Sequence, residues 1–265
     1  MSRCVLTVVV TLLAGCAAVP PIEERAAPKQ YVFVVLGEEG RAVARVITSA
    51  SKCPVVVIDG VPYPMDVRAV PATVAQRPTR SDPAESKPSA FPVLVCEKAV
   101  APGVMRAVVD GRALPLPKAN PKRIVVFGDT GCRIKTSDRA FQACNDAREW
   151  PFLDVANAAA DAAPDLVIHV GDYHYRENPC PAGNSGCAGS PWGYGWDAWE
   201  ADLFGPAQKL MAAAPWIVVR GNHESCDRAG QGWWRFLDPR PLASRQDCND
   251  PASDSIGRAS CRERV

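Results

Sequence analysis

The 265-residue sequence is short of histidine, of net charge and of long apolar runs. A formal net charge of +1 gives no basic surface that could follow a phosphate backbone, so we expect no nucleic-acid partner. With three histidines in all, a metal site would depend mainly on oxygen ligands. The content of 47% hydrophobic and 22% charged residues is that of an ordinary globular protein, which excludes a disordered chain.

The apolar stretch Val5–Leu13 is too short to span a bilayer but has the length of a signal-peptide core. It ends in Leu13-Ala14-Gly15-Cys16, a pattern typical of a bacterial lipoprotein signal. We therefore expect residues 1–15 to be removed and the lipid on Cys16 to hold the protein on the bacterial cell envelope. The alternative is a plain signal peptide and secretion. With the lipid anchor, residues 16–30 are expected to form the anchor and linker.

Cysteine, in contrast, is plentiful at eleven residues, which indicates an oxidising compartment and structural disulfides. No two cysteines have the C-x₂-C spacing of a zinc site, so a thiolate metal site is disfavoured. Cys4 belongs to the signal peptide, Cys16 to the anchor and Cys261 to the C-terminal tail. Connectivity cannot be proven from sequence. The simplest pairing joins neighbours along the chain: Cys53 with Cys96, Cys132 with Cys144, Cys180 with Cys187, and Cys226 with Cys248.

Residues 31–118 read as short strands separated by turns. Asp59-Gly60 and Asp110-Gly111 each follow an apolar run, and Asp-Gly favours the type I′ turn of a hairpin because both of its residues need positive φ. We expect a small all-β, sandwich-like domain, and nothing in it carries chemistry.

Residues 119–255 change to strands that alternate with helices, which predicts an α/β layer with a parallel sheet. The strands are expected at Ile124–Phe127, Leu166–Val170 and Trp216–Val219, and the helices at Pro151–Ala163 and from Trp196 to Leu210. Helical spacing places Trp196 and Trp199 in the core. Residues 256–265 have no apolar period and resemble one reading frame of a widely used sequencing adapter. We therefore expect them to be a non-native tail; the alternative is a genuine polar terminus.

A polar signature beginning with glycine follows each of the three strands. The signatures are Gly128-Asp129-Thr130-Gly131, Gly171-Asp172-Tyr173-His174-Tyr175 and Gly221-Asn222-His223-Glu224. Because ligands gather beyond the carboxyl ends of parallel strands, we expect all three to converge on one site. Carboxylate and amide oxygens, with tyrosine and histidine nearby, suit a pair of hard metal ions that bind phosphate.

These signatures resemble those of the calcineurin-like metallophosphoesterase superfamily over about residues 122 to 228. Asp129-Thr130-Gly131 has glycine where most members have histidine, and Asp172-x-x-Tyr175 with Gly-Asn-His-Glu is similar to the purple acid phosphatase branch. The resemblance implies the α/β sandwich of that superfamily, of which this chain would hold the N-terminal half. It also implies hydrolysis of phosphomonoesters. The alternatives are phosphodiesterase or nucleotidase activity, or a lipid-anchored binding module whose metal site has decayed.

The resemblance assigns a dinuclear metal site to the signatures. Asp129 and Tyr175 would bind a first metal, ferric iron, and Asp172 would bridge to a second, divalent one (Fe, Zn or Mn) bound by Asn222. Tyr175 rather than Tyr173 would be the ligand because it fits the Asp-x-x-Tyr spacing. The substrate would be a phosphoester, and its identity and the oligomeric state are not implied.

His223 would donate a hydrogen bond or a proton to the phosphoryl group, and Glu224 would orient it. His169 lies inside a strand and is expected to be buried and hydrogen-bonded, whereas His174 could reach substrate or lie solvated in a loop. The superfamily completes its metal shell with three more histidines, and no histidine follows Glu224 in this sequence. We therefore expect the chain as written to bind metal poorly and to show no phosphatase activity.

Overall fold

The structure is a computed structural model that describes residues 29–243 and 246–250. The predicted signal peptide, the lipidation site Cys16 and the tail at 256–265 lie outside the described residues, so these expectations stay predictions. In the part that is described, no helix has the length and apolar character needed to cross a membrane.

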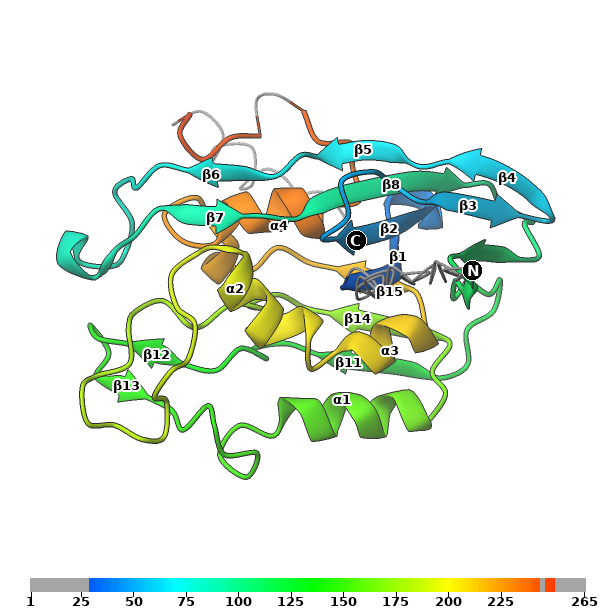
Figure 1. The fold of residues 1–265 in the computed structure, drawn as a ribbon. Coiled ribbons are helices and arrows are strands. Elements are labelled where there is room, and N and C mark those ends of the chain that lie inside the picture. The colour runs from blue at the N-terminus through cyan, green and yellow to red at the C-terminus, as the bar shows by residue number, and fades with distance from the viewer. Residues whose placement is uncertain (1–28, 244–245, 251–265) are drawn as a thin grey trace, which may run out of the picture.

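A seven-stranded mixed sheet forms the centre of the molecule, in the order β11-β14-β15-β1-β2-β8-β5 (Figure 1). The first four strands of this order run parallel to one another, and the remaining pairs are antiparallel. Their bounds are β11 (Ile124–Phe127), β14 (Leu166–His169), β15 (Trp216–Val218), β1 (Gln30–Leu36), β2 (Ala42–Thr48), β8 (Leu94–Val100) and β5 (Asp66–Ala69). The predicted parallel strands of the α/β layer are confirmed.

Three smaller sheets accompany the central one. A four-stranded sheet contains β10 (Arg112–Ala113), β9 (Ala107–Val109), β3 (Val55–Ile58) and β4 (Val61–Pro64), and two hairpins pair β6 (Ala72–Val74) with β7 (Ser89–Phe91) and β12 (Ile134–Lys135) with β13 (Ala140–Phe141). The β3–β4 turn has φ values of 47° at Asp59 and 86° at Gly60, and Asp110 and Gly111 are likewise positive at 45° and 77°. Both predicted type I′ hairpins are confirmed.

The helices are α1 (Phe152–Asp161), α2 (Trp196–Trp199), α3 (Gln208–Ala213) and α4 (Gly230–Phe236), with a π-helical segment at Glu200–Phe204. Short 3₁₀ turns lie at Glu38–Gly40, Pro83–Glu85 and Asn222–Glu224. The helix expected from Trp196 to Leu210 is therefore broken, because Gly205 and Pro206 interrupt it and proline has no N–H to continue the ladder. Trp196 and Trp199 are buried in the main core, as predicted.

Hydrogen bonds cross the predicted boundary between residues 118 and 119. Val35 of β1 is paired with Trp216 of β15, so strands from both predicted domains belong to one sheet. On one face of β1, Tyr31 and Phe33 pack against Phe204 with ring centroids 5.7 and 5.9 Å apart. A β-rich N-terminal region and an α/β region are present as expected, but they share a sheet and its main core. The boundary itself stays a prediction.

The β-rich region does contain the expected sandwich-like packing. The face of β1, β2 and β8 opposite the helices contacts the four-stranded sheet through a second core. The Cys53–Cys96 disulfide joins Cys53, two residues before β3, to β8 and so links the two layers. All four predicted pairs are disulfide-bonded, which confirms the neighbour-to-neighbour pairing.

The strands that precede the first two polar signatures are partly exposed. Ile124 and Val126 of β11 are 48% and 59% exposed, and Val170, which follows β14, is 52% exposed. Their neighbours Val125 and Phe127 pack on the main core. Because side chains alternate along a strand, this part of the sheet has one covered face among the described residues.

Candidate functional site

The three polar signatures follow β11, β14 and β15 and lie together at the carboxyl edge of the sheet. The Tyr175 hydroxyl donates a hydrogen bond to Oδ1 of Asp129 and lies 3.4 Å from Oδ2 of Asp172. The backbone N–H of His223 donates to Oδ1 of Asp172 at 2.9 Å. The structure therefore brings the predicted residues of all three loops into contact.

Glycine is required where two of these loops meet. A Cβ atom on Gly221 would lie 2.1 Å from Oδ1 and 2.4 Å from the backbone N of Asp172. Gly171 has φ of 109°, and a Cβ atom there would lie 2.8 Å from Cα of Gly221. Glycine at these positions therefore lets one loop approach the other.

Four oxygen-bearing side chains make up the candidate metal-ligand set. Asp129, Asp172 and Tyr175 are in contact. The Asn222 amide, oriented to satisfy both its groups, donates from its nitrogen to Oδ2 of Asp172 at 3.2 Å and accepts at its oxygen from Arg228 Nη1 at 3.3 Å. Burial, and then the hydrogen bond to Asp129, hold the pKa of Tyr175 far above its ordinary value. The Tyr175 phenol thus keeps its proton beside the two carboxylates. A bound cation would instead favour the deprotonated phenolate.

These oxygens fit one part of a site for a hard cation, because carboxylate, phenolate and amide oxygens are ligands such ions accept. Among residues 29–243 and 246–250, however, no group of three or more histidine, cysteine, aspartate or glutamate side chains is placed to hold a metal ion. The four side chains therefore have the oxygen atoms that a metal centre uses, but the described residues add no histidine, cysteine or further carboxylate cluster to complete it.

His223 is buried, and its ring packs on Tyr175 with centroids 3.9 Å apart. Its Nδ1 lies 3.0 Å from the carbonyl oxygen of His174 and 3.4 Å from Oε1 of Glu177. Two acceptors beside Nδ1 assign the hydrogen of the neutral ring to that nitrogen. Burial, and then the positive charge of Arg228, lower the pKa of His223 to about 3.

Glu224 does not orient His223 as expected. Its buried carboxylate accepts hydrogen bonds from the backbone N–H groups of Asp172 at 3.0 Å, Tyr173 at 2.9 Å and Gly221 at 3.1 Å. Burial raises the pKa of Glu224 to about 8, while these amides act in the opposite direction. Glu224 therefore holds together the loops after β14 and β15, and the contacts to the imidazole come from Glu177 and the His174 carbonyl.

The side chains of the other two histidines are buried in the interior. His169 is fully buried and bonded to Thr130 Oγ1 at 3.0 Å, which confirms the expected structural role. His174 is also fully buried and packs against Tyr194 and Trp199, with centroid distances of 5.5 and 5.9 Å. Both roles considered for His174, substrate contact and a solvated loop, are therefore wrong.

Tyr173 points into the core, where its hydroxyl donates to the carbonyl of Val219 at 3.1 Å. Tyr175 is thus the tyrosine that reaches the two aspartates, as its spacing predicted.

Sequence reasoning missed two buried acids that position this site, Glu177 and Asp202. Asp202 is fully buried, accepts from the backbone N–H of Tyr175 at 2.8 Å and pairs with Arg176 Nε at 2.6 Å. Asp202 lies three residues after Trp199, so it falls on the apolar face of the predicted helix. A charged residue on that face could have indicated a buried carboxylate with a structural role. Glu177 gave no comparable signal because it lies in a loop.

The match to a protein-family model agrees with the geometry. Residues 122–257, about half of the chain, match the family model described as calcineurin-like phosphoesterase. A search of curated proteins found no match. Among solved structures, the purple acid phosphatase PPD1 from yellow lupin (Lupinus luteus) seeds is similar at 17% identity and a TM-score of 0.40. The match covers 75% of this chain and 36% of that one, so the chain spans about a third of its length.

Proposed function

Because the chain belongs to the calcineurin-like phosphoesterase family, we propose that its three strand-end loops form the phosphate-binding part of a metal-dependent phosphoester hydrolase. The observation that carries this proposal is the contact of the Tyr175 hydroxyl with both Asp129 and Asp172. Three oxygen ligands from two loops meet at the edge of a parallel sheet, where such enzymes bind their ligands. Phosphomonoesters are the first choice of substrate, with a phosphodiesterase or nucleotidase as the alternative.

We propose that Asp129 and Tyr175 bind ferric iron, that Asp172 bridges, and that Asn222 binds a divalent ion, Fe, Zn or Mn. Such an ion pair lowers the pKa of a bound water and neutralises charge on the phosphoryl oxygens. The support from this chain is the contact of the Tyr175 hydroxyl with both carboxylates and the approach of the Asn222 amide group to Asp172.

His223 is proposed to act on the phosphoryl group through Nε2. Its Nδ1 already faces the His174 carbonyl and Glu177, which leaves Nε2 as the nitrogen available to a ligand. The negative charge of a bound phosphoester would favour uptake of a proton by the ring, since an anion nearby stabilises imidazolium. The protonated ring could then donate a hydrogen bond or a proton to the leaving oxygen.

Attachment to the bacterial cell envelope through a lipid on Cys16 remains a proposal, with secretion as its alternative. Its support is the sequence pattern that ends at Cys16 and the four disulfides, which form in an oxidising compartment. Labelling cells with a radioactive fatty acid tests it, because the label should follow the protein and disappear in Cys16→Ser.

The gene itself provides the first test of the activity. We expect the codons after Ser255 to continue into a Gly-His-x-His element that supplies the missing histidines. A stop codon directly after Val265 would instead favour a lipid-anchored binding module with a decayed metal site.

The full gene product should then hydrolyse aryl phosphomonoesters, contain two metal ions and show a tyrosinate-to-iron absorption band. Active protein without that band would exclude the ferric site. For the 265-residue chain alone we expect poor metal binding and no turnover. Stoichiometric binding of two metal ions by that chain, or its turnover of an aryl phosphate, would contradict this.

A further inference from the structure

A cavity of about 700 Å³ opens beside Asp129 and Tyr175. Its walls come from the loop after β11, from the β12–β13 hairpin and from the start of α1. We propose that this cavity binds the alcohol part of the phosphoester and that it selects a flat aromatic ring. The inference rests on the proposed function, since it takes the phosphate to lie at the strand-end loops.

The walls are aromatic and held in place. Phe127, Phe141, Trp150 and Phe152 line the cavity. The Trp150 indole N–H donates to the Thr130 carbonyl at 2.9 Å, and the Arg176 guanidinium lies 4.9 Å from the centroid of its ring. Rings that are fixed before a ligand arrives lose little entropy on binding, and they offer edges and faces to another ring.

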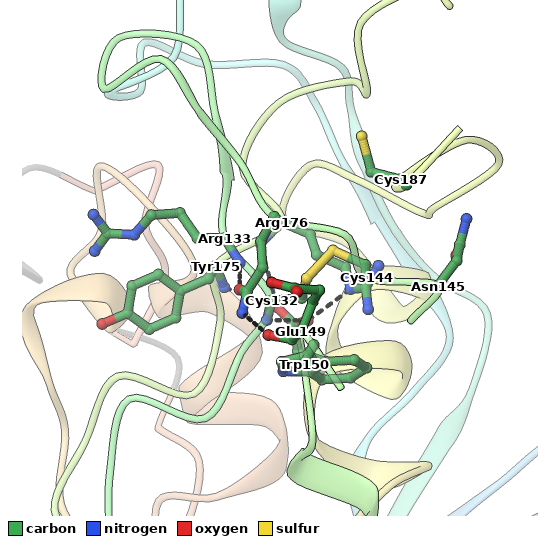
Figure 2. The surroundings of a disulfide bond; sticks show 12 residues. Cys132, Arg133, Cys144, Asn145, Glu149, Trp150, Tyr175, Arg176 and Cys187 are labelled. Carbon is green, nitrogen blue, oxygen red and sulfur yellow. Dashed lines mark hydrogen bonds and ion pairs between the residues drawn. A yellow bond between two sulfur atoms is a disulfide. The ribbon is translucent and has the colours of Figure 1, made fainter. Parts of the chain in front are cut away.

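The hairpin that carries Phe141 is fixed as well. The Cys132–Cys144 disulfide closes its base (Figure 2), and the backbone N–H of Cys132 donates to Asp202 at 3.0 Å. The aromatic walls therefore stand on a cross-linked element rather than on a loose loop, which favours a preformed binding site.

Arg133 supplies positive charge where the cavity meets the strand-end loops. Its guanidinium lies 5.0 Å from the centroid of the Tyr175 ring, and Figure 2 shows the two side chains next to each other. Tyr175 in turn contacts Asp129. A phosphoester that reached from these loops into the cavity would pass Arg133, whose planar guanidinium pairs well with phosphate oxygens.

Two neutral polar side chains that line the cavity, those of Gln142 and Thr130, are already engaged, which disfavours a sugar. Gln142 accepts from the backbone N–H of Arg133 at 3.0 Å and donates to the Glu149 carbonyl at 2.7 Å, and the Thr130 hydroxyl is bonded to His169. A sugar would bury hydroxyl groups that find few partners here, and unpaired buried hydroxyls are costly. An aryl or benzyl group meets no such penalty.

The cavity can be tested without metal or phosphate. Benzyl alcohol titrated into the 265-residue chain should shift the NMR signal of the Trp150 indole N–H. Phe141→Ala should weaken this binding several-fold, and Ala140→Trp, which fills the cavity, should abolish it. Tyr63→Ala, which removes an aromatic ring on the distant β4, is the matched control and should change nothing.

Kinetics of the full gene product test the substrate class. The ratio kcat/KM should be about tenfold higher for benzyl phosphate than for ethyl phosphate, since both leave as primary alcohols and differ in the ring. Ala140→Trp should remove this preference by lowering kcat/KM for benzyl phosphate to the value for ethyl phosphate, whereas Arg133→Gln should slow both esters.

Equal rates for the two esters, or a preference that survives Ala140→Trp, would overturn the cavity proposal and leave the proposed function intact. Hydrolysis of neither ester, with benzyl alcohol still bound beside Trp150, would instead overturn the proposed function.

Discussion

Oε1 of Glu177 lies 3.4 Å from Nδ1 of His223 in the interior of the protein. Glu177 comes five residues after Asp172 in the same loop, and it also accepts a hydrogen bond from the Tyr194 hydroxyl at 3.1 Å. One loop after β14 thus provides both a candidate metal ligand and a carboxylate that faces the candidate acid. Contacts between neighbouring loops position the side chains of the site, so substitutions at these contacts should change its stability and activity.

Replacing Glu177 by glutamine should lower the free energy of unfolding by about 1–3 kcal/mol, because buried partners lose a charged acceptor. Those partners are Tyr194, His223 and Arg228. Urea unfolding measures the loss. Glu39→Gln, at an exposed position of a surface turn, is the control and should stay within about 0.5 kcal/mol of the wild type. Equal stability of the two variants would show that Glu177 is not an anchor.

The contact between the loops after β14 and β15 predicts a large effect for Gly221→Ala. The added Cβ would overlap the backbone and side chain of Asp172, so the loops must separate, at a cost of at least about 2 kcal/mol. Gly183→Ala is the matched control: its φ is +82° but no atom lies within 4 Å of its added Cβ, and about 1 kcal/mol of backbone strain is expected. Thermal unfolding compares them, and a smaller loss at Gly221 would contradict the close approach.

Removing the Cys132–Cys144 disulfide by serine substitution should loosen the β12–β13 hairpin. The bond closes a loop of 12 residues and is expected to contribute about 3 kcal/mol through the unfolded state. Hydrogen exchange should rise at Ile134 and Phe141. Serine substitution at Cys53 and Cys96 should destabilise the whole protein without this local rise. An unchanged exchange rate in the first variant would mean that the hairpin needs no cross-link.

Burial of His169 gives the stability a pH dependence with a definite sign. Burial lowers its pKa from 6.5 to about 3. Between these values the unfolded chain binds a proton that the folded protein does not, so the stability falls as the pH drops through that window. The limiting slope is about 1.4 kcal/mol per pH unit, and above pH 6.5 there is no contribution.

An NMR titration of the imidazole and urea unfolding between pH 7 and pH 4 measure this effect. His169→Gln should flatten the dependence of stability on pH relative to the wild type, so the comparison cancels the contributions of the other titrating groups. Titration of His169 near pH 6.5 in the folded protein would contradict its burial.

Local features of the fold were predictable because local chemistry determines them. Asp-Gly turns need positive φ at both residues, so Asp59 and Asp110 marked their hairpins. The polar signatures could be placed at one edge because parallel strands share their carboxyl end. The family resemblance selected Tyr175 over Tyr173 as the candidate ligand, and in the structure the Tyr175 hydroxyl contacts the two aspartates.

Long-range features were not predictable, because nothing in a strand's own residues states which strand it joins. β1 and β15 are about 180 residues apart, and their pairing merged two predicted domains into one sheet. The burial of His174 and the contact of Glu177 with His223 likewise depend on which loops meet. For the same reason, Glu224 was expected to contact His223, whereas it accepts hydrogen bonds from backbone N–H groups of the two loops.

The central claim is that the three strand-end loops form one phosphoester-hydrolysing site. Its most direct test is to introduce Asp172→Asn into the full gene product and to measure kcat/KM for benzyl phosphate. The account predicts a loss of at least about a hundredfold, together with loss of bound metal. Asp66→Asn, at an exposed position on β5, should match the wild type. Wild-type activity and metal content in Asp172→Asn would contradict the account.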